Sequence, residues 1–113
     1  DVPKRVREMT AGEGVAVVYD GVGKDTFMGS LDSLRMRGLL VSFGNASGPV
    51  PPIEPLLLSQ KGSLYLTRPV LWHYTAKRED LLALAGELFA VVASGKVKIE
   101  VKVSTVFTPK SFK

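Results

Sequence analysis

The sequence predicts an α/β fold, a parallel sheet with helices on both faces, and three observations lead to this prediction. Residues 15–19 form a continuous apolar run, and residues 39–43 form a second one. Such runs are typical of parallel strands covered on both faces, because neither side of the strand meets water. A helix-like stretch separates the two runs, which is the alternation that parallel strands require.

The chain opens with a predicted helix. Asp1 can accept hydrogen bonds from the first free amides of a helix, and Pro3 is tolerated in the first turn, where no donor is needed. Its predicted inner face consists of Val2, Val6 and Met9. The glycine-containing segment 11–14 ends this helix, and a strand is expected from Val15 to Asp20.

A second helix is expected between the two apolar runs. Asp25 is placed to cap it, and Gly38 to end it directly before the strand at residues 39–43. Its predicted buried stripe, spaced i, i+4, i+7, consists of Phe27, Leu31 and Leu34.

Glycine and proline dominate residues 45–55, so a loop is expected there. Pro55 is suited to the first turn of a short helix that continues through Leu58. Residues 63–67 are predicted to form a third strand, which Pro69 closes.

The longest helix is expected from about Lys77 to Ser94, with Thr75 as its cap and Gly95 as its stop. Its predicted inner face consists of Leu81, Ala85, Leu88, Phe89 and Val92. From residue 97 to 103, apolar and charged residues alternate, which indicates a half-buried strand with one face in water. Such a strand suits an antiparallel sheet better than the parallel sheet before it.

Length and composition limit the function classes. A chain of 113 residues holds one domain at most, and 45% hydrophobic residues supply a core. We assign residues 1–95 to the α/β domain and residues 96–113 to a strand and tail that return toward another domain. Neither a membrane-length apolar run nor a signal-peptide pattern occurs, so we expect a cytoplasmic protein without membrane contact. The absence of cysteine excludes disulfides and zinc-thiolate sites within these residues.

The net charge of +4 does not indicate nucleic-acid binding. It comes from 15 basic and 11 acidic residues, and the basic residues are scattered, with no aromatic residues interleaved as a stacking platform. We therefore expect solvated charged faces and no nucleic-acid partner.

The residues for acid–base or nucleophilic chemistry are few. His73 is the only histidine, and it stands among aromatic residues, where packing or surface exposure is the ordinary role. Asp20, at a strand end, either binds a ribose hydroxyl or caps a turn, and the sequence leaves both open. Paired carboxylates, a serine triad spacing and a metal-ligand cluster are absent, so no catalytic and no metal-binding residue is predicted.

Two glycine-containing loops are the candidate binding site. Gly21 and Gly23 follow the first strand, and they would let backbone amides approach a ligand without a Cβ atom between them. Asn45 and Ser47 supply short polar groups after the next strand, at the same edge of the sheet, where open α/β sheets bind ligands. The alternative is that these glycines only form tight turns. The glycine fingerprint of dinucleotide-binding domains, G-x-G-x-x-G, is absent.

Three segments carry a resemblance to a known family. Residues 18–27, 38–48 and 64–69 read VYDGVGKDTF, GLLVSFGNASG and LYLTRP. They resemble the NADPH:quinone oxidoreductases, the zinc-independent, zeta-crystallin-like branch of the medium-chain dehydrogenase/reductase superfamily. The resemblance covers about residues 1–101, and it implies the second half of a Rossmann domain, strands four to six. The substrate domain and the phosphate-binding loop of such an enzyme would precede residue 1.

The resemblance also implies which residues line the cofactor. In the family, the turn after the fourth strand and the loop after the fifth lie near the ribose and nicotinamide, and the end of the sixth strand lies near the nicotinamide. The corresponding residues here are Gly21, Val22, Gly23, Phe43, Gly44, Asn45, Ala46, Ser47, Leu66 and Thr67.

By this resemblance the chain is a fragment of an enzyme that transfers hydride from NADPH to a quinone or enone-type acceptor. The fragment is expected to be inactive alone and to bind NADPH poorly, because the helix N-terminus that receives the pyrophosphate is absent. A homodimer is implied through the strand at residues 63–67, with Leu64 and Leu66 near the two-fold axis. The alternatives are a non-catalytic, self-associating sheet module and a small nucleotide-binding domain.

Overall fold

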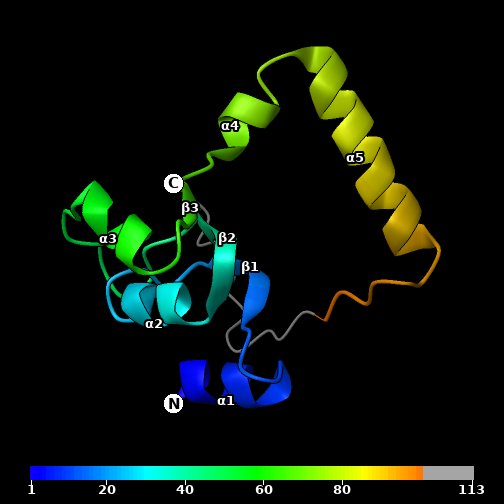
Figure 1. Ribbon diagram of the computed structural model, residues 1–113. Helices are drawn as coiled ribbons and strands as arrows, with labels where there is room; N and C mark the ends of the chain where they lie inside the picture. The colour runs from blue at the N-terminus through cyan, green and yellow to red at the C-terminus, as the bar shows by residue number, and fades with distance from the viewer. Residues whose placement is uncertain (101–113) are drawn as a thin grey trace, which may run out of the picture. The chain divides into compact units, whose positions relative to one another are not determined.

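A computed structural model describes residues 1–100 of the chain, and Figure 1 shows how its helices and strands alternate. In order, the elements are α1 (Val2–Met9), β1 (Val15–Asp20), α2 (Phe27–Asp32), β2 (Leu34–Ser42), α3 (Pro55–Gln60), β3 (Tyr65–Thr67), α4 (Leu71–Tyr74) and α5 (Arg78–Ala93). The chain forms two compact units, Asp1–His73 and a second that begins at Tyr74. The proposed boundary between residues 95 and 96 stays a prediction.

The first unit is built on a parallel sheet with the strand order β1-β2-β3. Tyr19 pairs with Val41 of β2, and Val41 pairs in turn with Thr67 of β3, so the three strands end at one edge of the sheet. The predicted α/β class is therefore confirmed, and strand β1 has the predicted bounds.

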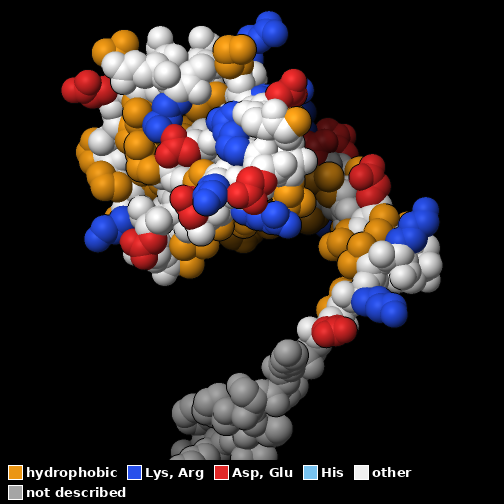
Figure 2. Space-filling model, turned by 60° about the horizontal axis from the view of Figure 1, so that its bottom comes forward, with side chains coloured by type: hydrophobic (Ala, Val, Ile, Leu, Met, Phe, Trp, Pro, Cys, Tyr) orange, Lys and Arg blue, Asp and Glu red, His pale blue; other side chains and the backbone are white. Residues whose placement is uncertain are grey.

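The core of the first unit lies between the sheet and its helices. Its buried side chains are Phe27, Leu31, Leu34, Leu40 and Leu64. Leu57 and Leu58 of α3 pack against this cluster, and Val15 and Val18 contribute from β1. Basic and acidic side chains lie interspersed on the face shown in Figure 2, as expected for solvated charges.

Helix α1 begins as predicted, but its inner face is different. Asp1 is the N-cap, and its carboxylate accepts a hydrogen bond from the Lys4 amide. Val2 and Met9 are exposed, whereas the partly buried residues of this segment are Pro3, Val6, Arg7 and Thr10. Spaced i, i+3, i+4, i+7, these form one helical stripe that includes a proline and an arginine, which a search for apolar residues does not find.

The predicted second helix was too long. Helix α2 begins after the N-cap Thr26 rather than at Asp25, and it ends at Asp32. Leu34 is buried, as predicted, but it belongs to β2. Val15 of β1 pairs with Leu34, but Val17 pairs with Leu39, so β2 contains extra residues at its start. This irregular stretch includes Arg37, which has a φ of 57°. Leu34 follows Leu31 at helical spacing, and that spacing alone cannot distinguish a helix from this bulged strand.

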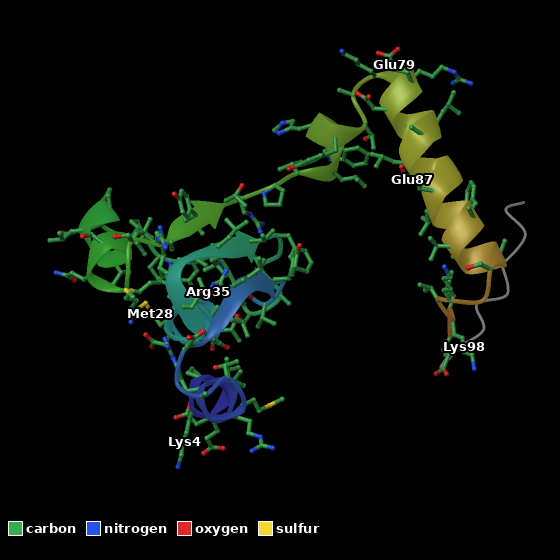
Figure 3. The ribbon with its side chains drawn as sticks, turned by 45° about the vertical axis from the view of Figure 1, so that its right-hand side comes forward. Lys4, Met28, Arg35, Glu79, Glu87 and Lys98 are labelled. Atoms are coloured by element: carbon green, nitrogen blue, oxygen red, sulfur yellow. The ribbon has the colours of Figure 1, made fainter. Side chains whose placement is uncertain are left out.

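The second unit contains α5, and Figure 3 labels Glu79 and Glu87 on it. The helix has the predicted extent, but its N-cap is Lys77, not Thr75. The predicted inner face is also wrong, since no residue of α5 is buried and Leu81, Leu88 and Phe89 are exposed. Leucines at adjacent positions, such as Leu81 and Leu82, surround the helix with apolar side chains, so they define no single stripe.

The strand predicted for residues 97–103 is not observed in its described part. Residues 98–100 have no regular secondary structure. Residues 101–103 lie outside the described residues. Alternating side chains alone do not form a strand, because a strand needs a partner with which to form hydrogen bonds.

Candidate functional site

The loops after β1 and β2 meet at the carboxyl edge of the sheet. They are joined through backbone hydrogen bonds rather than through side chains alone. The joined pairs are Phe43 N with Asp20 O at 2.8 Å, Ser47 N with Val22 O at 2.8 Å, Lys24 N with Gly48 O at 3.1 Å and Ala46 N with Gly21 O at 3.3 Å. The two predicted loops therefore form one continuous feature.

Two glycines are required by the close approach of these loops. A Cβ atom on Gly44 would lie 2.3 Å from the carbonyl oxygen of Gly21, which is inside any real contact. Gly23 has a φ of +91°, and a Cβ atom there would lie 2.7 Å from the carbonyl oxygen of Gly48. The tight-turn alternative thus has a direct physical basis, and a role in ligand binding stays a prediction beside it.

Asp20 caps the turn that follows β1. It is buried, and its carboxylate accepts hydrogen bonds from two backbone amides and two hydroxyls. These donors are Val22 N at 2.8 Å, Gly23 N at 3.0 Å, Thr26 Oγ1 at 2.9 Å and Ser30 Oγ at 2.8 Å. Burial by itself raises the pKa of Asp20, but these hydrogen bonds outweigh it and lower the pKa below its ordinary value. Both oxygens are occupied, so of the two alternatives the structure supports the cap.

Some side chains at the joined loops are hydrogen-bonded within the loops, whereas others are exposed and free to contact a ligand. The hydroxyl of Ser47 accepts from the Asp25 amide at 3.0 Å and donates to the Val22 carbonyl at 2.9 Å, so it serves the loop itself. The ring of Phe43 is half exposed and lies against Gly21. The side chain of Val22 is also part exposed. Apolar surface of this kind suits a planar ring better than a phosphate.

The end of β3 reaches the same edge. Leu66 and Thr67 pair with Leu40 and Val41 of β2, so Thr67 lies one strand away from the second loop. Arg68 follows, and its guanidinium donates to the carbonyl of Ser42 at 2.6 Å. No role was predicted for Arg68 from the sequence. In the structure, its side chain joins the end of β3 to the end of β2.

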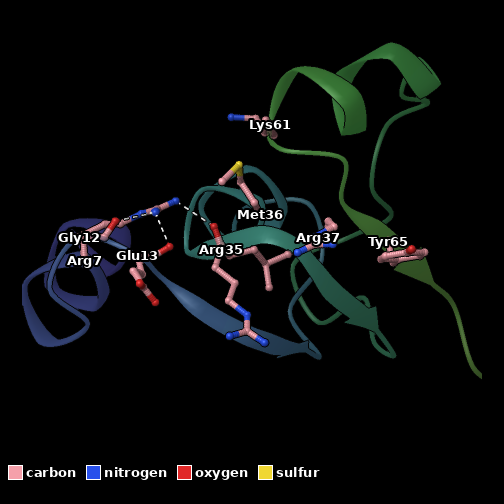
Figure 4. A pocket seen from close by; sticks show the side chains of 9 residues that line it. Arg7, Gly12, Glu13, Arg35, Met36, Arg37, Lys61 and Tyr65 are labelled. Atoms are coloured by element: carbon pink, nitrogen blue, oxygen red, sulfur yellow. Dashed lines mark hydrogen bonds between the residues drawn. The ribbon is translucent and has the colours of Figure 1, made fainter.

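The amino-terminal end of the sheet contains a separate hollow of about 780 Å³, shown in Figure 4. Arg7 lines it, and its guanidinium donates to the carbonyls of Gly12, Glu13, Asp32 and Leu34. In Figure 4 the Arg35 side chain extends away from Lys61, so these cations do not converge on one point. The hollow contains none of the predicted site residues.

Few titratable groups accompany the predicted site. His73 is exposed on α4. Across residues 1–100, no three His, Cys, Asp or Glu side chains are placed to share a metal ion. In the same range, no helix has both the length and the apolar character of a membrane span. The arrangement offers backbone groups and the part-exposed apolar side chains of Val22 and Phe43, and their role in binding a ligand stays a prediction.

The parallel sheet, with loops joined at the carboxyl ends of its strands, places the chain in the class of open α/β domains, which bind ligands at that edge. A profile of the family described as zinc-binding dehydrogenase matches residues 1–84. The chain therefore belongs to the zinc-binding dehydrogenase family.

Several similar proteins are quinone oxidoreductases, as the resemblance predicted. The quinone oxidoreductase of Salmonella typhimurium is 55% identical over 100 residues, which are 88% of this chain and 31% of that protein. The structure of a Pseudomonas syringae quinone oxidoreductase matches with a TM-score of 0.87 at 53% identity, over 89% of this chain and 31% of that one. An Escherichia coli quinone oxidoreductase complexed with NADPH matches with a TM-score of 0.86 at 51% identity, over 90% and 31%. The chain thus spans about 31% of the length of these relatives.

Proposed function

We propose that this chain is the later part of the nucleotide-binding domain of an NADPH-dependent quinone oxidoreductase. The enzyme transfers hydride to a quinone or enone-type acceptor. The observation that carries the proposal is the combination of 51% identity and a TM-score of 0.86 with the E. coli enzyme complexed with NADPH. Identity this high over 90% of the chain exceeds what a shared fold alone requires.

The cofactor site is proposed at the joined loops and the end of β3. The residues assigned to it are Gly21, Val22, Gly23, Phe43, Gly44, Asn45, Ala46, Ser47, Leu66 and Thr67. The part-exposed Val22 and Phe43 provide apolar surface that fits a nicotinamide ring. The cofactor supplies the hydride, and these residues bind and orient the cofactor. The scarcity of acid–base groups is therefore compatible with the reaction.

Grafting tests this function. Residues 1–100 replace the matching segment of the E. coli quinone oxidoreductase, and the oxidation of NADPH by 1,4-benzoquinone is followed by absorbance. The proposal predicts turnover within about tenfold of the parent enzyme, because one factor of ten corresponds to only about 1.4 kcal/mol of transition-state stabilisation. A folded graft that does not oxidise NADPH would refute it.

The 113-residue chain alone is proposed to bind NADPH weakly, since the phosphate-binding helix N-terminus is not among its residues. Isothermal titration of NADPH into the purified chain measures this directly. A dissociation constant in the low micromolar range would mean that the loops described above supply most of the affinity.

A homodimer through β3 is also proposed. Within the described residues β3 pairs with β2 alone, and Tyr65 on it is exposed. Leu64, expected near the two-fold axis, is buried in the core, so Tyr65 and Leu66 are the better candidates for contact. A charge on an edge strand opposes pairing, so Tyr65→Lys is expected to shift a sedimenting dimer toward monomer. A wild-type chain that sediments as a monomer at every concentration would refute the interface.

We further propose zinc independence, from the resemblance of residues 18–27, 38–48 and 64–69 to a zinc-independent branch, and we propose a cytoplasmic location. Elemental analysis of the active graft is expected to find less than one zinc ion per site. Cell fractionation of the natural protein tests its location, and recovery with membranes would contradict it.

A further inference from the structure

The carboxylate of Asp20 is buried without a cationic partner. Its residue is only 4% exposed, and none of the ion pairs within residues 1–100 includes it. Its charge is balanced by neutral donors alone, two of which are amides of the turn at residues 21–23. Hydrogen bonds to a charged group are the stronger ones, so this turn is fixed more firmly than turn residues by themselves require.

Val22 carries this constraint into the second loop. Its amide donates to Asp20 Oδ1 at 2.8 Å, and its carbonyl accepts from the amide and the hydroxyl of Ser47 at 2.8 and 2.9 Å. The backbone amide of Val22 is therefore bound by Asp20, and its carbonyl is bound by Ser47. The Val22 carbonyl shares a peptide plane with the Gly23 amide, which also donates to Asp20 Oδ1 at 3.0 Å, so the carboxylate holds that carbonyl near Ser47.

We propose that Asp20 is a positioning residue, which holds the loop of residues 44–48 in place through Val22. This inference rests on the proposed function only in assigning that loop to the cofactor. The hydroxyls of Thr26, the N-cap of α2, and of Ser30 within α2 complete the network and anchor it to this helix. A buried carboxylate with four donors costs the fold little, whereas an apolar residue in its place would leave those donors unsatisfied.

Amide hydrogen exchange, resolved by residue in the full 113-residue chain, tests the inference. Asp20→Ala removes every acceptor, and protection of the Ser47 amide is expected to fall about tenfold or more. Asp20→Asn keeps one acceptor oxygen and should restore part of that protection, because neutral hydrogen bonds are about half as strong. Asp25→Ala is the matched control, since its carboxylate is exposed on the same loop and its backbone amide remains.

Ser30→Ala is a milder variant that keeps the carboxylate and removes one donor, and it carries the test if Asp20→Ala does not fold. It is expected to lower Ser47 protection measurably but less than Asp20→Asn. Equal loss at Ser47 and at Val41 in the β1–β2 ladder would overturn the inference, because it would indicate general destabilisation. The inference would also be overturned if Asp20→Ala, or Ser30→Ala in its place, lowered protection of the Ser47 amide no more than Asp25→Ala does. The exchange is measured without cofactor, so its failure and an inactive graft are separate results.

Discussion

Gly44→Ala tests whether the joined loops are as close as the structure has them. The added Cβ atom would lie 2.3 Å from the carbonyl oxygen and 2.8 Å from the Cα atom of Gly21, both of which are backbone atoms. Ordinary contact begins near 3.4 Å, so the two loops must separate by about 1 Å. Such a shift would stretch the 2.8 Å bond between Ser47 and Val22 beyond hydrogen-bond distance.

The expected destabilisation follows from these two losses. Overpacking costs about 1–3 kcal/mol, and one or two broken hydrogen bonds add about 1 kcal/mol each, so the free energy of unfolding should fall by about 2–4 kcal/mol. Urea unfolding followed by circular dichroism measures the change. Gly29→Ala is the control. Its Cβ atom would lie an ordinary 3.5 Å from Pro3 of α1. Gly29 itself lies in α2, and alanine is more stable than glycine inside a helix by up to about 1 kcal/mol. Equal stability of the two variants would refute the reasoning.

Two further predictions concern Asp20 and Arg7, polar side chains that each make four or more hydrogen bonds. The lowered pKa of Asp20 stabilises the fold fully above the ordinary aspartate value of about 3.9, and this contribution is lost as pH falls through the lower folded-state pKa. Acid titration of stability should therefore be steeper below about pH 4 for the wild type than for Asp20→Asn, and parallel curves would contradict the assignment. Arg7→Met removes a half-buried guanidinium from four carbonyls and should lower the free energy of unfolding by about 2–3 kcal/mol. Arg5→Met, at an exposed ion pair with Glu8, should change it by less than about 1 kcal/mol, and a similar loss in both would show that the carbonyl contacts contribute little.

Strand β1 and the loops after β1 and β2 were predictable because local chemistry specified them. The apolar run of β1 ends at a buried aspartate and two glycines, and each of these has a steric or hydrogen-bonding reason in the structure. The close approach of Gly44 to Gly21 was not predictable from spacing, because it depends on the backbone path of both loops and not only on the edge that the strands share. Family resemblance supplied that residue, and the distances supply its physical reason.

The errors arose where tertiary contacts override local pattern. Leu34 continues the helical spacing of Leu31, yet it is the first residue of β2. The irregular start of this strand is stabilised by a hydrogen bond that the Arg37 amide donates to the Gly62 carbonyl at 2.8 Å. The sequence also gave no indication that four carbonyls accept hydrogen bonds from Arg7. The apolar side chains around α5 predict burial, but they do not say against what.

A crystal structure of the grafted enzyme with NADPH tests the central claim most directly. It is predicted to place the nicotinamide and its ribose against the loop at residues 44–47, with the ring near Phe43 and Val22, and with the Asp20 carboxylate still bound to the turn. A cofactor whose nicotinamide lies away from both loops would contradict the account. So would one whose ribose is bound by Asp20 in place of Val22.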